Sequence, residues 1–211
     1  MSATPFEGLD EGALHKLAPG GVVRSYARNV VVVNEGDATD SLYVVLSGRV
    51  KAFVSDENGK EIIVSTIGGG DYFGELVLDG GARSASIMTL EASRFFVIPH
   101  RDVEALLATN PEFARNLMHK LIGKVRSLTA RVLDLALKDV YGRLVKYLEE
   151  SAVDEGGRRL VPGRLTQSEI AAHIGGSREM VSRILRDLAA GGYVSVEAKR
   201  IILHRKLPAH W

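Results

Sequence analysis

The chain has 211 residues, 45% of them hydrophobic, which is enough for one large domain or two small ones that each bury a core. It contains no cysteine, and this excludes disulfide bonds, thiolate catalysis and iron–sulfur clusters held by cysteine. The formal net charge is +1, but residues 139–211 carry 12 Lys and Arg against 9 Asp and Glu, whereas residues 1–138 carry 15 against 17. This asymmetry weakly favours a nucleic-acid-binding C-terminal end.

The beginning of the chain predicts neither an export signal nor a membrane anchor. The stretch MSATPFEGLDEGAL is acidic and lacks the basic and apolar regions of a signal peptide. No apolar run approaches the roughly 18 residues that a membrane span needs. We therefore expect a cytoplasmic protein without a membrane partner.

The first predicted element is a helix over residues 6–18, ended by Pro19 and two glycines. Its apolar residues at helical spacing are Phe6, Leu9, Leu14 and Leu17. Short runs rich in β-branched and aromatic residues then predict strands at 22–27, 31–34, 41–54, 60–67 and 84–98. Asn58-Gly59 gives the strongest hairpin signal, because both residues tolerate positive φ. Many short strands with glycine turns predict a β-barrel or a sandwich.

The next part of the chain is predicted to be helical. Residues 100–110 form a short helix that stops before Pro111, and a long helical pattern runs from about residue 111 to 137. Its apolar residues recur in alternating steps of three and four, at Met118, Leu121, Val125, Leu128, Val132 and Leu135. This is the seam of a coiled coil. Two interpretations remain open, a helix packed on its own barrel and the parallel helix of a homodimer.

A further helix over residues 139–151 and a polar stretch lead to a helix-turn-helix pattern. Thr166 and Glu169 have the spacing of a capping box, in which each side chain accepts a bond from the other residue's backbone N–H. Gly175-Gly176 makes the turn, and Ser177 is a natural N-cap for the second helix.

That second helix has two distinct faces. Its inner stripe is Val181, Ile184, Leu185 and Leu188, and its outer stripe is Arg178, Glu179, Ser182, Arg183 and Arg186. Arginine can bond the O6 and N7 atoms of guanine, and glutamate can accept from the N4 amine of cytosine. The pattern therefore favours a helix that reads the DNA major groove. The alternative is a solvated charged face.

The last predicted element is a β-hairpin over residues 193–196 and 201–203, the wing of a winged helix-turn-helix. Lys199 and Arg200 in its turn suit contacts to DNA phosphates, which position a protein without specifying sequence. The alternative role of these two residues is solubility.

Four stretches of the chain, in the right order around the long helix, resemble the cyclic-AMP receptor protein and fumarate-nitrate regulator family. They are Gly70–Leu76, Arg83–Ala85, Asp139–Leu144 and Ser177–Arg183. The resemblance covers nearly the whole chain. It implies an α+β fold with a cyclic-nucleotide-binding β-barrel (a double-stranded jelly roll) over residues 1–110, a dimerisation helix over 111–138 and a winged helix-turn-helix over 139–211.

The same resemblance implies a non-enzymatic transcription regulator that binds palindromic double-stranded DNA as a homodimer, with RNA polymerase as a further partner. The implied DNA-contacting residues are Thr166, Gln167, Ser177, Arg178, Glu179, Ser182, Arg183, Lys199 and Arg200. In the receptor protein, the residues matching Arg178, Glu179 and Arg183 read a half-site with a GTGA-like core, so we expect a similar half-site here.

The residues of the barrel motif also suit an anionic effector. A turn that starts at Gly74 can aim the N–H groups of Glu75 and Leu76 at an anion, Arg83 can pair with a phosphate, and Ser84 can add a hydroxyl donor. Glu75 can accept from a ribose hydroxyl. By resemblance these residues form a cyclic nucleotide site, with cAMP as first choice and cGMP or another nucleotide open. The alternative is a barrel that senses nothing.

Two positions depart from the family's pattern. Val77 stands where the family often has a small residue, and the base-contacting Thr-Ser pair of the receptor protein falls at Leu128-Thr129. Leu128 has no hydroxyl and lies on the predicted seam, whereas Thr129 could keep the contact from the partner helix. The six histidines show no ligand pairing at short spacing, so we expect no metal and no haem. The chain also lacks a phosphate loop and a nucleophile elbow, which argues against an enzyme.

These features together predict effector-linked DNA binding. A ligand between barrel and dimer helix would favour one arrangement of the seam, and a hinge near residues 138–139 would then set the spacing of the two recognition helices. The ligand can shift this equilibrium only by its differential affinity for the two arrangements.

Overall fold

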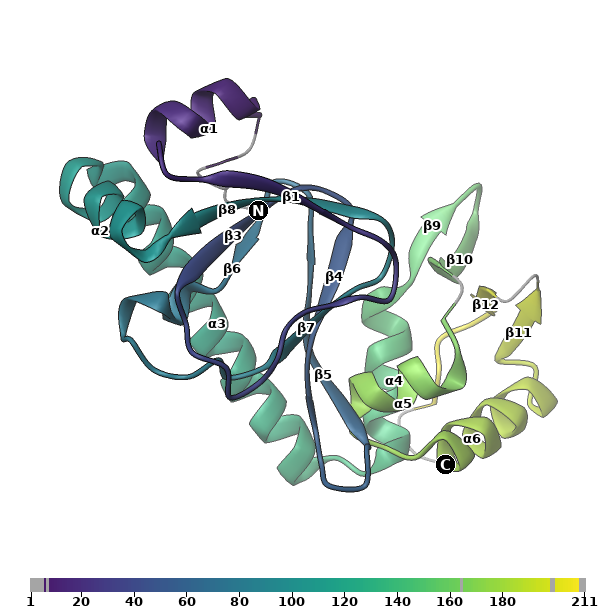
Figure 1. Ribbon diagram of the computed structural model, residues 1–211. Helices are drawn as coiled ribbons and strands as arrows, with labels where there is room; N and C mark the ends of the chain where they lie inside the picture. The colour runs from purple at the N-terminus through teal and green to yellow at the C-terminus, as the bar shows by residue number, and fades with distance from the viewer. Residues whose placement is uncertain (1–5, 7, 164, 198–199, 209–211) are drawn as a thin grey trace. The chain divides into compact units, whose positions relative to one another are not determined.

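The computed structural model describes residues 6, 8–163, 165–197 and 200–208, and the chain forms two compact units, Met1–Val125 and Arg126–Trp211 (Figure 1). Each unit has its own hydrophobic core. Within the described ranges, no helix combines the length and the apolar character that a membrane span requires.

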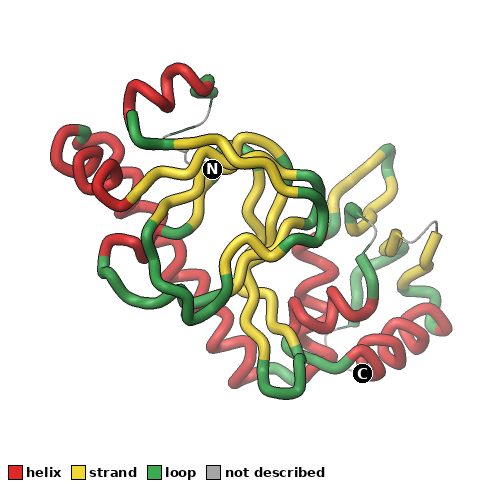
Figure 2. Tube along the Cα trace, in the orientation of Figure 1, coloured by secondary structure: helices red, strands yellow, loops and turns green. Residues whose placement is uncertain are grey.

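The first unit contains two four-stranded antiparallel sheets with strand orders β1-β8-β3-β6 and β2-β7-β4-β5 (Figure 2). The strands are β1 (Val22–Tyr26), β2 (Val31–Val33), β3 (Ser41–Ser47), β4 (Arg49–Ser55), β5 (Glu61–Gly68), β6 (Tyr72–Phe73), β7 (Ser86–Thr89) and β8 (Ser93–Pro99). Inward residues of both sheets form one core, including Val45, Val50, Ile87 and Phe95. The predicted β-rich N-terminal half is confirmed.

A second core lies on the other side of the sheet that holds β3 and β8. Helices α1 (Glu11–Leu17), α2 (His100–Thr109) and the beginning of α3 (Pro111–Leu137) contribute to it. The predicted first helix is shorter than expected, because Asp10 caps it by accepting from the Ala13 N–H at 2.7 Å. Val77 is completely buried in this core. Its size therefore serves packing.

Two glycines decide how the predicted strand runs are divided. Gly48 has φ +90° and separates β3 from β4, so the run over residues 41–54 is two strands. Gly59 has φ +76° in the β4–β5 hairpin, which is confirmed, but Asn58 does not take positive φ there. Asp56 holds this turn instead, because its Oδ1 accepts from the N–H groups of Asn58 and Lys60, each at 2.9 Å.

Gly48→Ala is expected to lower the free energy of unfolding by about 2 kcal/mol or more, through positive φ and overpacking together. A Cβ at Gly48 would lie 2.3 Å from Ser93 Oγ and 2.7 Å from the Ala92 carbonyl oxygen. Gly59→Ala is the matched control, since it has positive φ but nothing within 4 Å of the added carbon. Urea unfolding midpoints measure both. Equal losses for the two variants would contradict the close approach at Gly48.

Helix α3 begins and ends where the sequence predicts. Asn110 precedes Pro111 and its Oδ1 accepts from the Phe113 N–H at 3.0 Å, so the first turn is capped. Gly123 lies in the interior of α3, where an added Cβ would meet nothing within 4 Å. Packing among the described residues of this chain therefore does not require a glycine at this position.

The second unit contains the C-terminal part of α3 and a winged helix-turn-helix. Its further elements are α4 (Val140–Ser151), β9 (Val153–Glu155), β10 (Arg158–Val161), α5 (Gln167–Ile174), α6 (Arg178–Ala190), β11 (Val194–Glu197) and β12 (Arg200–Leu203). The strands form one sheet in the order β11-β12-β10-β9. The β9–β10 hairpin was not predicted from its polar sequence, although it supplies buried Leu160 and Val161.

Candidate effector and DNA-recognition sites

The turn at Gly74 joins β6 to a short 3-10 helix over Glu75–Leu78. Gly74 has φ +89°, and a Cβ there would lie 2.7 Å from Arg83 Nη1 and 2.8 Å from the Ser41 carbonyl oxygen. The guanidinium of Arg83 thus lies directly against the backbone of Gly74. Only glycine combines this backbone conformation with so close an approach.

Arg83 is buried, with 6% of its surface exposed. Its Nη2 donates to the Ser41 carbonyl oxygen at 3.0 Å and lies 3.6 Å from the carboxylate of Asp40, which is largely exposed. Within the described residues, Arg83 Nε and Nη1 have no hydrogen-bond partner. A buried cation with unpartnered donors is costly, and an anion that accepts from two of its N–H groups would remove that cost.

Glu75, which follows Gly74, is also buried. Its Oε1 accepts from Lys124 Nζ, but its Oε2 has no partner among the described residues. A carboxylate with one free buried oxygen can accept from a hydroxyl. We call Gly74, Glu75 and Arg83 the effector site. It combines donors for an anion with an acceptor for a hydroxyl, and its role in binding an effector stays a prediction.

The other predicted effector residues are placed differently. Leu76 is half-buried in the 3-10 helix, and Ser84 is exposed. Leu128 and Thr129 are exposed on the part of α3 that belongs to the second compact unit, whereas Glu75 and Arg83 belong to the first. The contact of Leu128 and Thr129 with a ligand therefore stays a prediction.

Two lysines on α3 were missed by the sequence analysis. Lys120 Nζ binds the carboxylate of Asp71 and the Tyr72 carbonyl oxygen, and Lys124 binds Glu75. Lys120 also lies 3.6 Å from the centroid of the Tyr72 ring, and burial lowers the pKa of this lysine. The lysines are four residues apart, as are the two carboxylates, and this matched spacing was the signal that could have revealed them.

The predicted seam of α3 is exposed on the chain. Its residues have exposed fractions of 38–64%, at Met118, Leu121, Val125, Leu128, Val132 and Leu135. Earlier in the same helix, Phe113 and Leu117 are buried in the first unit. An apolar stripe of this length is typical of an interaction surface. Ile122, Leu133 and Leu137 are also exposed but lie off the stripe.

The helix-turn-helix agrees with its prediction in detail. Thr166 Oγ1 accepts from the Glu169 N–H at 3.1 Å, and Glu169 Oε2 accepts from the Thr166 N–H at 2.6 Å, so the capping box is present. Gly175 ends α5 with φ +65°, and Ser177 Oγ accepts from the Met180 N–H at 3.2 Å at the start of α6. The inner stripe of α6 is completely or nearly buried, at Val181, Ile184, Leu185 and Leu188.

The outer stripe of α6 is available to a partner. Arg178, Glu179, Arg183 and Arg186 are exposed, and Ser182 is half-buried. Arg183 Nη2 lies 2.9 Å from Met180 Sδ. In the part of the chain that the structure describes, the side chains of Arg178, Glu179 and Arg186 make no hydrogen bond or ion pair.

The remaining predicted DNA contacts are partly engaged within the chain. Thr166 is exposed but its hydroxyl serves the cap, and Gln167 is half-buried. Arg200 is exposed and forms an ion pair with Glu155 at 3.1 Å. Lys199, predicted at the wing tip, lies outside the described residues. Across those residues, no group of three or more histidine, aspartate or glutamate side chains could hold a metal ion.

Comparison with known proteins agrees with both halves of this arrangement. Residues 23–110 match the cyclic nucleotide-binding domain and residues 142–207 the Crp-like helix-turn-helix domain. The chain is 32% identical over 203 residues to a CRP-like cAMP-activated global transcriptional regulator of Mycobacterium tuberculosis, across 94% of this chain and 91% of that protein. The chain belongs to the Crp/Fnr family of transcription regulators.

Further relatives support the assignment of this chain to the Crp/Fnr family. It is 29% identical over 187 residues to the cAMP-activated global transcriptional regulator CRP of Salmonella typhimurium, across 86% of this chain and 89% of that protein. Its fold is similar, with a TM-score of 0.81, to that of the c-di-GMP responsive global regulator CLP of Xanthomonas campestris. That likeness covers 93% of this chain and 100% of the other at 24% identity, so it concerns the fold alone. The predicted family, fold class and non-enzymatic role are confirmed.

Proposed function

We propose that this Crp/Fnr regulator binds palindromic DNA as a homodimer in the cytoplasm and that a cyclic nucleotide, cAMP in the first place, controls it. The observation that carries the effector part is Arg83, a buried cation whose Nε and Nη1 have no hydrogen-bond partner in the described part of the chain. Glu75 Oε2 is the complementary unpartnered acceptor. A phosphate and a ribose hydroxyl supply the matching groups. The cAMP-activated relatives favour cAMP over other cyclic nucleotides.

The base of the nucleotide is the less constrained part of this proposal. Leu128 cannot donate or accept a hydrogen bond, so we assign the base contact to Thr129 of the partner subunit. A nucleotide held mainly by phosphate and ribose would discriminate poorly between adenine and guanine. The alternatives are therefore regulation by cGMP or another nucleotide, and DNA binding that needs no ligand.

The DNA-binding part of the proposal rests on α6 and on the exposed seam. Arg178, Glu179 and Arg183 are exposed near the beginning of α6, where a recognition helix meets base edges. A parallel pairing of two α3 seams would present two such helices to two half-sites. RNA polymerase is the further partner that we expect of a transcription regulator of this kind.

Calorimetric titration with cAMP, cGMP and c-di-GMP, followed by selection of DNA sites from a random pool, tests this proposal. We expect saturable binding of one cyclic mononucleotide per chain and a selected palindrome with GTGA-like half-sites. Failure of all three nucleotides to bind would leave the ligand-independent alternative. Selection of no palindrome would contradict the dimeric DNA-binding function itself.

Glu179→Ala and Arg183→Ala are each expected to weaken binding to the selected site by about 5- to 150-fold, because each removes about 1–3 kcal/mol of base discrimination. Binding to scrambled DNA should change much less. Arg186→Ala is the matched control, since it removes an exposed cation further along α6. Competition binding assays with both DNAs give the ratio. A uniform loss on both DNAs would assign Glu179 and Arg183 no role in reading bases.

A further inference from the structure

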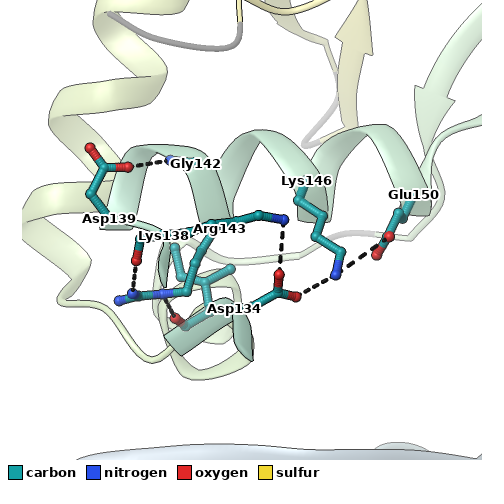
Figure 3. Close-up of polar contacts among 8 residues, drawn as sticks. Asp134, Lys138, Asp139, Gly142, Arg143, Lys146 and Glu150 are labelled. Carbon is teal, nitrogen blue, oxygen red and sulfur yellow. Dashed lines mark hydrogen bonds and ion pairs between the residues drawn. The ribbon is translucent and has the colours of Figure 1, made fainter. Parts of the chain in front are cut away.

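The junction between α3 and α4 is bridged by one carboxylate. Asp134, in the last turn of α3, binds two lysines with its two oxygens (Figure 3). Its Oδ1 lies 2.8 Å from Lys138 Nζ, and its Oδ2 accepts from Lys146 Nζ, which comes from α4. The first pair lies at the end of one helix, whereas the second crosses from α3 to α4.

The interactions within this cluster favour the charged forms of Asp134 and Lys146. The hydrogen bonds from Lys138 and Lys146 lower the pKa of Asp134, and the hydrogen bond that Lys146 donates to Asp134 raises the pKa of Lys146. Only 21% of the Asp134 side chain and 31% of the Lys146 side chain are exposed. An isolated ion pair on the surface contributes little to stability. A partly buried carboxylate that binds two cations contributes more.

Arg143 connects the same junction to the helix-turn-helix. Its Nη1 donates to the Lys138 carbonyl oxygen at 2.7 Å, and its Nε donates to the Ile174 carbonyl oxygen at 2.8 Å, at the end of α5 (Figure 3). Leu135 Cδ2 would lie 3.2 Å from a Cβ at Gly175, so the turn before α6 packs against the last turns of α3. The start of α6 is thereby linked to the end of α3.

We propose that Asp134 is a positioning residue for DNA recognition, because its bond to Lys146 fixes the angle between α3 and the helix-turn-helix. The inference rests on the proposed dimeric DNA binding. In a dimer joined through α3, this angle sets the separation of the two α6 helices and hence the half-site spacing. The predicted hinge lies near residues 138–139, and the Asp134–Lys146 bond spans it, so this bond must open before the hinge can bend.

Asp134→Asn and Lys146→Gln, alone and combined, test the proposal. Glu150→Gln is the matched control, because Glu150 lies 3.8 Å from Lys146 Nζ within α4 but does not reach α3. Each protein is titrated with palindromes of the selected half-site whose spacing is shortened or lengthened by one base pair. The measured quantity is the ratio of affinities for the best and the altered spacing.

We expect both single variants to lower this ratio by about threefold to tenfold, as for a contact that couples two elements. The double variant should lose no more than either single one, and Glu150→Gln should keep the wild-type ratio. An unchanged ratio in Asp134→Asn would overturn the proposal. A circular dichroism melt identifies a variant that has unfolded. If Asp134→Asn has unfolded, the affinity ratio of Lys146→Gln tests the proposal in its place.

Amide hydrogen exchange separates this inference from the proposed function. Amides at the end of α3 and the beginning of α4 should exchange at least about threefold faster in Asp134→Asn than in the wild type, since the junction opens more often. If the wild-type chain bound no palindrome, the proposed function would fail. The exchange data would still test whether the Asp134–Lys146 bond holds the junction between α3 and α4. Unchanged exchange in Asp134→Asn would overturn it.

Discussion

Arg83→Met should weaken cyclic nucleotide binding by about 100-fold and remove the effect of the nucleotide on DNA affinity. The variant keeps much of the side-chain volume but loses the two N–H donors, Nε and Nη1, that have no partner among the described residues. Two charge-assisted hydrogen bonds contribute about 3 kcal/mol or more together, which is about 100-fold in affinity. Calorimetry gives the binding constant, and DNA titration with and without nucleotide gives the response.

Arg83→Lys provides the informative comparison. Lysine keeps the positive charge but cannot offer two parallel N–H groups, so it should restore only part of the affinity. Because Arg83 is a buried cation with incomplete hydrogen bonding, Arg83→Met should not lower the stability of the ligand-free protein greatly. Wild-type nucleotide affinity in Arg83→Met would show that the effector does not use this arginine.

Val132→Glu should convert the protein from dimer to monomer and lower its affinity for a palindrome by about 100-fold or more. Val132 is 64% exposed within the apolar stripe, and in a parallel pair the two glutamates would face each other. A monomer loses the increase in effective concentration that a second linked half-site provides, which is about 10²- to 10⁴-fold. Sedimentation and titration with full and half sites measure both effects.

Ala130→Glu is the control for Val132→Glu. Ala130 is exposed on the same helix but lies off the stripe, so the same added charge should leave a dimer with full affinity. Equal behaviour of the two variants would show that the stripe is not the dimer seam. Half-site affinity should be the same in all three proteins, since none of these changes touches α6.

The sequence predicts those elements best whose ends are fixed by local hydrogen bonds. The capping box at Thr166 and the Asn110–Pro111 start of α3 depend on residues close in sequence, so pattern alone locates them. The β9–β10 hairpin was missed because its strands are short and polar, and only Leu160 and Val161 are buried. That burial depends on the sheet partner β12, which is distant in sequence.

The candidate sites, too, are predictable where they depend on local sequence and not where they depend on distant residues. The residue types of the effector site are readable from the motif around Gly74 and Arg83, but the unpartnered atoms of Arg83 become visible only with its neighbours in place. Lys124 lies off the apolar stripe of α3, so the periodic pattern of this helix does not point to it. Its role depends on Glu75, which is 49 residues away in the chain.

Gly123 makes the backbone of α3 locally easier to deform than its length alone would suggest. At 27 residues the helix is about 40 Å long, with Lys120 and Lys124 fastening one part of it to the first unit and Asp134 fastening its end to α4. Glycine has more backbone freedom than other residues and a low helix propensity, so a helix deforms more easily where it contains one. Gly123 lies between these two lysines, so the backbone freedom that glycine gives is confined to a segment of α3 that is anchored to the first unit on both sides.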